Sequence, residues 1–301
     1  MPFAPAAAAS APLFSVVIPT YNRPHQIPDL LKSWAAVDFP HDSFELLLLD
    51  DGGDFDLAPL VAAQAEKLPV RLFRLPHRGL SATRQSGLEQ ARGRYYLCTD
   101  DDCRPHQNIL RAYAAALSRH PEAALGGTVH NLLLDDWFAT TTQEIITFAT
   151  ARWNQNPENA HFFNGSSIVF PTETLRRIGG FDPSWIQRTG EDRDLCRRWE
   201  EAGHRLVSVP DALMGHAHHL HLRSFLRQHF HYGQGNYHTQ RRRTRPGAGA
   251  PNFSGISFYL ALLAYPFQVF SGTKALAIFT LILCAQVATL AGLLQAWHRD
   301  R

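Results

Sequence analysis

The chain has 301 residues, of which 45% are hydrophobic and 19% charged, a composition typical of a packed globular protein rather than a disordered one. Its 29 basic and 27 acidic residues leave a formal charge of +2, so no overall field favours a nucleic acid as partner. The four cysteines, at positions 98, 103, 196 and 284, form no Cys-x-x-Cys pair, which favours reduced thiols in the cytosol over a disulfide framework.

The first part of the chain predicts alternating strands and helices. Residues 1–12 are rich in Ala and Pro without the pattern of a secretory signal, and we interpret them as a flexible lead-in. From residue 14 to about residue 128, short apolar runs alternate with helical patterns, which indicates βαβ units around a mostly parallel sheet. A helix is expected after Pro24, with Asn22 as its N-cap, and another over residues 81–91. Strands are predicted over residues 14–19, 44–49, 70–75 and 95–99.

Acidic clusters follow two of these strands. Asp50 and Asp51 follow the second strand, and Asp100, Asp101 and Asp102 follow the fourth. Ligands of open α/β sheets bind beyond the carboxyl ends of strands, so we expect both clusters to face one crevice. In extended backbone Asp100 and Asp102 point the same way and suit a divalent cation, which would neutralise a diphosphate leaving group. For the first cluster, a role in turn formation alone is the alternative.

A second group of acids opens a predicted helix after Gly190. Asp192 lies three and four residues before Leu195 and Cys196, on the apolar face of that helix. We therefore expect Asp192 to point inward, where a carboxylate can remove the proton of an acceptor hydroxyl. Glu191 is the second candidate catalytic carboxylate at this helix start. The alternative is that such acids only complement the helix dipole.

Seven histidines lie between residues 216 and 238. His216 is a candidate further ligand beside Asp102, since imidazole is acceptable to Mn²⁺ and less natural for Mg²⁺. A zinc site is the less favoured alternative, because the spacing of Cys and His matches no structural zinc module. Most of the other histidines are interpreted as surface or interfacial side chains.

The C-terminal part of the chain is strongly apolar. Residues 275–294 are long enough to cross the ~30 Å hydrocarbon core and are a candidate membrane span. Residues 255–270 are shorter and contain Pro266, so crossing, re-entry and an interfacial position all stay open. A helical pair docked on the protein itself is the alternative. Arginines flank the two segments, which predicts a hairpin with both ends cytoplasmic: Arg241, Arg242, Arg243, Arg245, Arg299 and Arg301.

Taken in order, these motifs resemble the family 2 glycosyltransferases, of the bacterial membrane-associated type. The likeness extends over residues 13–240 and implies an α/β fold of the GT-A type, a mixed sheet flanked by helices. Residues 241–301 then form a basic linker and membrane-associated helices. The matching positions are residues 16–23, 50–52, 79–93, 100–102, 179–182, 190–192, 210, 216 and 232–235.

The resemblance implies an inverting transfer from a nucleotide-diphosphate sugar to a hydroxyl of a sugar or lipid-linked acceptor. Such enzymes synthesise polysaccharides or glycolipids at the cytoplasmic side of the inner (plasma) membrane. By resemblance Asp192 is the base, while Asp102, Asp100 and His216 hold Mn²⁺ or Mg²⁺. Residues 162–167 are expected beside the acceptor, and Leu195, in place of the glutamine of processive synthases, indicates single-sugar transfer. The expected donor contacts are Pro19, Thr20, Tyr21, Asp50, Asp51, Arg84 and Asp101.

Two other interpretations fit parts of the sequence. A nucleotidyltransferase has a similar sheet, but it would carry a Gly-rich phosphate loop after the first strand, where this chain has Pro19-Thr20-Tyr21-Asn22. A non-catalytic membrane-bound scaffold that retains the fold is the third hypothesis. Hydrolysis of a donor in the presence of Mn²⁺ separates an enzyme from a scaffold.

Overall fold

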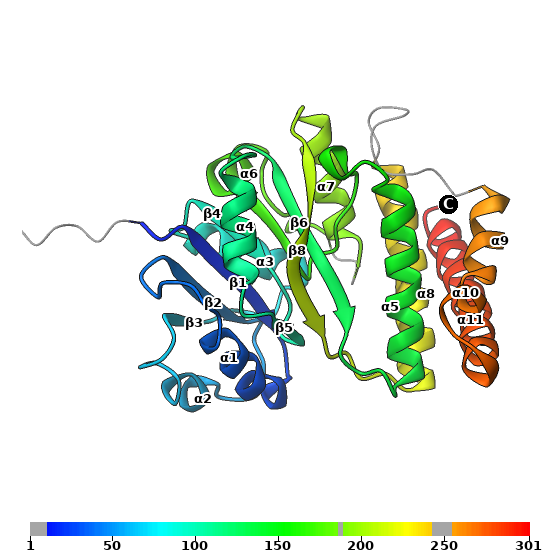
Figure 1. Ribbon diagram of the computed structural model, residues 1–301, viewed down its shortest axis with the longest axis horizontal. Helices are drawn as coiled ribbons and strands as arrows, with labels where there is room; N and C mark the ends of the chain where they lie inside the picture. The colour runs from blue at the N-terminus through cyan, green and yellow to red at the C-terminus, as the bar shows by residue number, and fades with distance from the viewer. Residues whose placement is uncertain (1–10, 186–188, 243–254) are drawn as a thin grey trace, which may run out of the picture.

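The computed structural model describes residues 11–185, 189–242 and 255–301. Most of the expected lead-in, and Arg243 and Arg245 of the expected basic linker, lie outside these residues. The described part is a mixed sheet covered by helices, with a layer of long helices at one end (Figure 1).

The sheet has eight strands in the order β3-β2-β1-β4-β7-β6-β8-β5. The four predicted strands are confirmed and lie side by side in parallel: β1 (Phe14–Thr20), β2 (Phe44–Asp50), β3 (Val70–Arg74) and β4 (Tyr95–Cys98). The second half of the sheet is mixed, because β7 is antiparallel to both β4 and β6. Its strands are β5 (Cys103–Pro105), β6 (Ala124–Asn131), β7 (Ile168–Pro171) and β8 (Leu206–His216).

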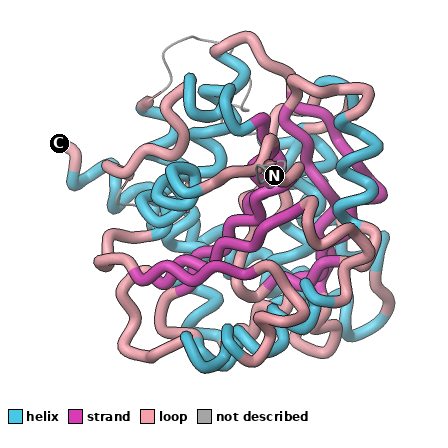
Figure 2. Tube along the Cα trace, turned by 90° about the vertical axis from the view of Figure 1, so that its left-hand side faces the viewer, coloured by secondary structure: helices cyan, strands magenta, loops and turns pink. Residues whose placement is uncertain are grey.

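Helices cover both faces of this sheet (Figure 2). Successive strand residues point to opposite faces, so Val16 packs in one hydrophobic core and Val17 in the other. The first core includes apolar residues of α1 (Ile27–Ala35) and α4 (Ile109–Leu117). The second core includes residues of α3 (Leu80–Gln90), α6 (Thr172–Arg177) and α7 (Glu191–Glu201). The smaller elements are α2 (Ala58–Ala62), η1 (Pro24–Gln26) and η2 (Pro157–Asn159).

The expected N-cap at Asn22 is wrong. A short 3-10 turn, η1, precedes α1, and no side chain caps either element. Asn22 instead has a left-handed backbone with φ of 54°, which Asn tolerates better than most residues. Its side chain donates to Asp54 Oδ2 at 3.1 Å and accepts from the Asp54 amide at 2.7 Å. Asn22 therefore joins the loops after β1 and β2 rather than starting a helix.

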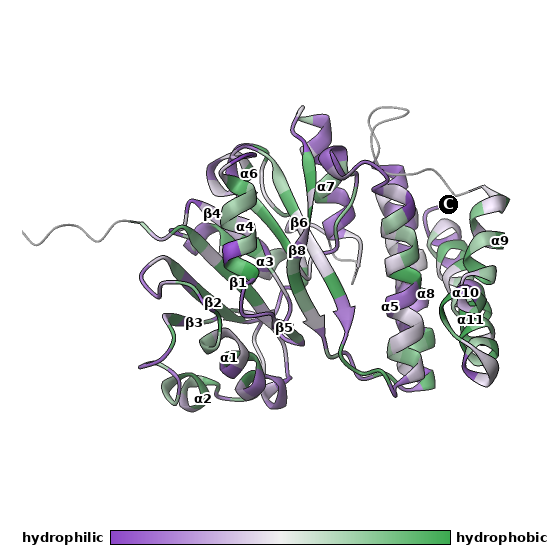
Figure 3. Ribbon diagram, in the orientation of Figure 1, coloured by the Kyte–Doolittle hydropathy of each residue, from purple (hydrophilic) through white to green (hydrophobic). Residues whose placement is uncertain are grey.

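The C-terminal layer consists of long helices beside the sheet domain. Helix α11 (Gly272–Arg299) runs along α8 (Leu222–Arg241), and α5 (Trp137–Trp153) lies next to both. Two glycines allow the close approach, because a Cβ at Gly233 would lie 1.9 Å from a carbonyl of α11 and one at Gly292 would lie 1.9 Å from a carbonyl of α8. Helices α9 (Ile256–Ala264) and α10 (Pro266–Val269) complete the layer, which is rich in apolar residues (Figure 3).

Among the described residues, α11 is the one helix whose length and apolar composition suffice to cross a membrane. One stripe of it is buried against the protein, including Ile278, Ile282 and Ala285. A second apolar stripe faces outward, and we call it the outer stripe: Leu276, Leu283, Val287, Leu290, Leu294 and Trp297. Helix α11 thus packs on the protein along one side and keeps an exposed apolar stripe along the other.

Candidate active site

The acids predicted to share a crevice lie at one edge of the sheet. Because β1, β2 and β4 are parallel neighbours, their carboxyl ends bring Thr20, Asp50 and the segment from Asp100 to Asp102 together. The end of β8 adds His216, since β5 pairs with β8 in antiparallel register from Cys103 opposite His216. The fold therefore assembles this cluster from four strands that are far apart in sequence.

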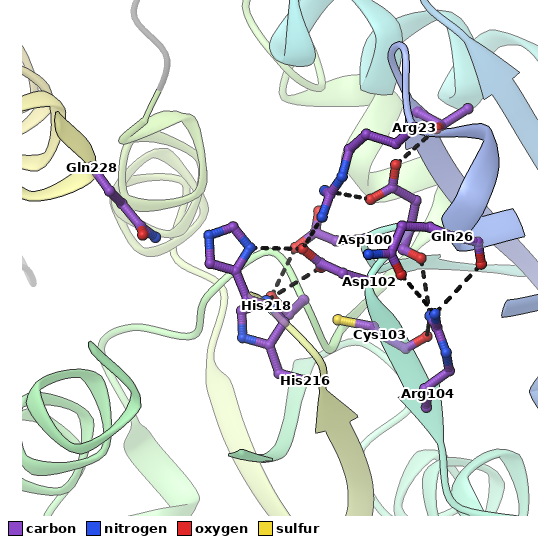
Figure 4. A network of polar contacts seen from close by, with 12 residues as sticks. Arg23, Gln26, Asp100, Asp102, Cys103, Arg104, His216, His218 and Gln228 are labelled. Carbon is purple, nitrogen blue, oxygen red and sulfur yellow. Dashed lines mark hydrogen bonds and ion pairs between the residues drawn. The ribbon is translucent and has the colours of Figure 1, made fainter. Parts of the chain in front are cut away.

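Asp102 is the centre of the cluster, and three basic side chains point at it (Figure 4). Its carboxylate lies 3.2 Å from His216 Nε2, 2.9 Å from His218 Nδ1 and 2.8 Å from Arg23 Nη2. Burial opposes the ionised form, but the hydrogen bonds from His216 and His218 and the charge of Arg23 hold the pKa of Asp102 well below its ordinary value. The same contact with Asp102 outweighs burial and raises the pKa of His216.

Asp101 is bound by Thr20 and Arg23 rather than by the two histidines at Asp102. It accepts hydrogen bonds from Thr20 Oγ1 at 2.7 Å and from Arg23 Nη1 at 2.6 Å. Burial raises the pKa of Asp101 to about 6, against the effect of Arg23. Arg23 therefore bridges Asp101 and Asp102 and ties the loop after β1 to the acidic segment.

Asp100 belongs to a buried ion network with Arg84 and Glu191. The two guanidinium nitrogens of Arg84 contact Asp100 at 2.6 Å and Glu191 at 2.5 Å. Ser166 donates to the other oxygen of Asp100 at 2.8 Å. Burial, and next the nearby charge of Asp192, raise the pKa of Glu191 to about 7. The fully buried Arg84 thus joins α3, the acidic segment and the start of α7.

Asp192 lies beside the same network at the first turn of α7. It is half-buried, and it accepts from the Gly165 amide at 3.2 Å and from the Arg193 amide at 2.8 Å. Residue 166 next to Gly165 binds Asp100, so one short segment contacts both acids. Of residues 162–167, expected beside the acceptor, Gly165 and Ser166 therefore link Asp192 to Asp100, whereas Phe162 and Phe163 pack in the second core.

The loop after β2 forms a second part of the site. Asp51 accepts hydrogen bonds from the Arg78 and Gly79 amides at 3.0 Å each, and His77 Nδ1 lies 2.8 Å from it. The imidazole of His77 stacks on the exposed ring of Tyr21, with 4.1 Å between centroids. Asp50 instead stabilises its own turn, because it accepts a hydrogen bond from the Gly53 amide. Pro19, which we expect to contact the donor, lies within β1.

The sequence analysis assigned no role to three residues of this cluster: Arg23, His77 and His218. His218 was not singled out among the seven histidines, yet it contacts Asp102 as closely as His216 does. The His-x-His spacing in extended backbone was the available signal, because residues two apart share a face. Arg23 and His77 carry no such local signal. The partners of Arg23 lie 78 and 79 residues away in sequence, and the partner of His77 lies 26 residues away.

The comparison with known families decides what kind of site this is. Residues 15–179, more than half of the chain, match the model of glycosyl transferase family 2. The chain belongs to this family. It is therefore a glycosyltransferase, and the nucleotidyltransferase and scaffold hypotheses are less favoured than the transferase that the motifs predicted.

Solved structures confirm the predicted fold class. The mannosyltransferase PcManGT of Pyrobaculum calidifontis, in complex with GDP-Man and Mn²⁺, has a TM-score of 0.70 at 19% identity, with 100% of this chain and 92% of that one covered. Staphylococcus aureus TarS 1–349 with UDP-GlcNAc has a TM-score of 0.55 at 16% identity, with 96% and 92% covered. The GT-A architecture is thus shared over nearly the whole length of these chains.

The sequence relatives are matched over a smaller share of their length than the solved structures are. The glycosyltransferase AglE of Haloferax volcanii is 23% identical over 69% of this chain and 68% of that protein. The undecaprenyl-phosphate 4-deoxy-4-formamido-L-arabinose transferase of Aeromonas hydrophila is 31% identical over 44% of this chain and 42% of that protein. The match to the S. aureus TarS transferase spans only 19% of that protein's length.

The residues around Asp102 fit a divalent cation. One ligand atom each from Asp102, His216 and His218 lies within 4.8 Å of the others. A carboxylate with two imidazoles suits Mn²⁺ or another transition metal better than Mg²⁺. Cys103 forms a second group with Asp100 and Asp102, but burial raises the pKa of its thiol well above the ordinary value.

Proposed function

We propose that the chain transfers a sugar from a nucleotide-diphosphate donor to an acceptor hydroxyl with inversion of configuration, in the synthesis of a polysaccharide or glycolipid. The contacts of His216 and His218 with Asp102 carry this proposal. Asp192 lies close to this group, because the adjacent residues Gly165 and Ser166 bind Asp192 and Asp100 respectively. One cluster thus contains side chains that could bind a cation for the leaving group and a carboxylate that could act as base for the acceptor.

In the proposed reaction Asp102, His216 and His218 hold a divalent cation, with Asp100 beside them. The bound cation supplies positive charge that stabilises the departing diphosphate. Asp192 takes the proton of the acceptor hydroxyl as its oxygen attacks the anomeric carbon from the opposite face, which inverts the configuration. Arg84 keeps Asp100 and Glu191 fixed, so Glu191 positions the site rather than reacting itself. Arg23 offsets part of the acidic charge of Asp101 and Asp102.

The nucleotide is proposed to bind at the loops after β1 and β2. The exposed ring of Tyr21, stacked on His77, offers an aromatic surface for the base. Asp51 holds the 77–79 turn through two backbone amides and fixes His77 in place. The donors named for PcManGT and TarS, GDP-Man and UDP-GlcNAc, define the two nucleotide classes to test first.

Membrane association through the C-terminal helices at the cytoplasmic face is the third part of the proposal. Helix α11 packs along α8, through contacts such as Gln234 with Gln295. A crossing α11 would carry the neighbouring part of α8, which includes Arg227, into hydrocarbon, at about 3 kcal/mol for a charged side chain. We therefore propose that α11 lies in the plane of the interface with its outer stripe in the lipid, as interfacial helices do.

The activity is tested by donor hydrolysis and transfer with purified full-length protein. A panel of GDP- and UDP-sugars is incubated with Mn²⁺, and released nucleotide is measured with and without chelator. We expect chelator-sensitive turnover that Asp102→Asn abolishes, while Asp211→Asn, at an exposed acid elsewhere, has no effect. Turnover that survives both the chelator and Asp102→Asn would contradict the metal-dependent mechanism.

The membrane orientation is tested by flotation of the full-length protein with phosphatidylethanolamine and phosphatidylglycerol vesicles. The double variant Val287→Lys, Leu290→Lys places two charges on the outer stripe and should reduce the bound fraction at least tenfold. The control Ala62→Lys, Ala65→Lys adds the same charge at exposed sites near α2. Equal flotation of both variants would refute a lipid contact of the outer stripe.

A further inference from the structure

Helix α8 carries a row of three polar side chains, spaced four residues apart and therefore on one side of the helix. We call this row the α8 ridge: Gln228, Tyr232 and Asn236. At one end of the ridge, the amide of Gln228 points toward His218 (Figure 4). At the other end, Asn236 accepts a hydrogen bond from Arg193 of α7. The ridge thus faces the candidate active site, although no role has yet been given to Tyr232.

The packing of α8 against the start of α7 fixes the ridge beside Asp192. A Cβ at Gly235 would lie 2.6 Å from the carbonyl oxygen of Thr189, so only glycine allows this close approach. The Thr189 hydroxyl donates to the carbonyl of His231 at 3.0 Å. Thr189 comes three residues before Asp192 in sequence. The ridge and the proposed base are therefore held together by direct contacts between their two helices.

Two hydrogen-bonding groups of the ridge are left without a partner within the described residues. Gln228 Nε2 donates to Tyr232 Oη at 2.6 Å, which leaves the hydroxyl proton of Tyr232 available to donate elsewhere. The other amide atom, Gln228 Oε1, is buried and accepts no hydrogen bond. A buried polar atom without a partner is unfavourable. One free donor beside one free acceptor is the complement of a hydroxyl group, which both accepts and donates.

The hydroxyl of Tyr232 is protonated and lies close to the acids of the site. Burial raises the pKa of Tyr232 to about 12, and the hydrogen bond from Gln228 lowers it only in part. The charges of Asp192 and Asp100 raise it further, which shows that both carboxylates are near the phenol. All four side chains are partly exposed, so a solute can reach them together.

We infer that Tyr232 and Gln228 bind a sugar acceptor and hold its reacting hydroxyl beside Asp192. The inference rests on the proposed function and adds the residues that select the acceptor. One hydroxyl of the sugar accepts from Tyr232 Oη and donates to Gln228 Oε1. A neighbouring hydroxyl gives its proton to Asp192 while its oxygen bonds to the anomeric carbon and the bond from that carbon to the diphosphate breaks.

The test compares sugar transfer with donor hydrolysis in the full-length protein, using the nucleotide sugar that the native chain hydrolyses. Octyl β-D-glucoside, β-D-galactoside and β-D-mannoside serve as acceptor probes. Tyr232→Phe removes only the hydroxyl, and Gln228→Leu removes the amide at similar size. Each should raise the KM for the glycoside at least tenfold, with the rate of donor hydrolysis by water and the KM for the donor unchanged. The matched control is Tyr237→Phe, which removes a phenol hydroxyl of α8 beside Arg241 and should change neither reaction.

The division between the two reactions separates acceptor binding from a structural role. An unchanged KM for the glycoside in both ridge variants overturns the inference. Equal losses of transfer and hydrolysis also overturn it, because a structural role affects both reactions alike. A native chain that hydrolyses donor but transfers sugar to none of the glycosides overturns it as well. A native chain that hydrolyses no donor contradicts the proposed function instead.

Discussion

Replacement of Glu191 by Gln should change how stability depends on pH. The Glu191 carboxyl is buried, and its Oε2 makes no hydrogen bond within the described residues, while Oε1 contacts Arg84. Burial and the charge of Asp192 raise the pKa of Glu191 from 4.5 to about 7 in the folded protein. Glutamine keeps the shape of the side chain and removes its ionisation.

The magnitude follows from the difference between the folded and unfolded pKa. One pKa unit corresponds to ~1.4 kcal/mol, so the span from 4.5 to about 7 is worth about 3 kcal/mol. Because the folded pKa is raised, the folded state holds the proton more tightly than the unfolded chain. This contribution is complete below pH 4.5 and is lost as the pH rises to about 7. The native chain should therefore lose stability relative to Glu191→Gln over this interval.

Urea unfolding of both proteins between about pH 4.5 and pH 8 measures this change. The free energy of unfolding of Glu191→Gln minus that of the native chain should increase by about 3 kcal/mol with rising pH. Glu66→Gln, at an exposed position, controls for the loss of a carboxylate. A difference that stays constant within about 0.5 kcal/mol, or that decreases with pH, would refute the assignment of a buried, proton-retaining Glu191.

Three further substitutions test other parts of the structure. Asp192→Asn should lower kcat by about 10²- to 10⁴-fold with nucleotide affinity unchanged, and normal turnover in a transfer assay would exclude it as the base. His218→Ala should weaken Mn²⁺ binding at least ~tenfold by calorimetry, and an unaltered affinity would remove it from the ligand set. Gly292→Leu should cost about 1–3 kcal/mol of stability by separating α11 from α8, whereas exposed Ala291→Leu should not; equal melting temperatures would contradict this packing.

Deletion of the C-terminal helices would be a poor test of membrane binding. Ile278 and Ile282 of α11 form a small core with Leu262, against which Ile145 and Phe148 of α5 pack. Removal of the last fifty residues would expose this apolar surface of α5 and favour aggregation. Point substitutions on the outer stripe leave the core intact, so they separate lipid binding from folding.

Local pattern in the sequence was enough to predict the parallel half of the sheet, its acidic strand ends and the family. Strands and helices are predicted from hydrophobic periods of 2 and 3.6 residues. The Asp100 to Asp102 motif is complete within three consecutive positions. Contiguous chemistry of this kind is visible without coordinates. The spacing of Asp192 to Leu195 and Cys196 predicted an inward face, and the structure leaves this side chain half-buried at the first turn of α7.

Only the tertiary structure decided which charges meet and where the apolar helix lies. The contacts of Arg23 and His218 with Asp102 and of Arg84 with Glu191 join residues 79 to 116 positions apart. No periodicity encodes such distances, because they depend on the crossovers that set the strand order. Helix α11 has the composition of a membrane span, but it packs along the polar helix α8. A hydropathy profile does not contain this packing.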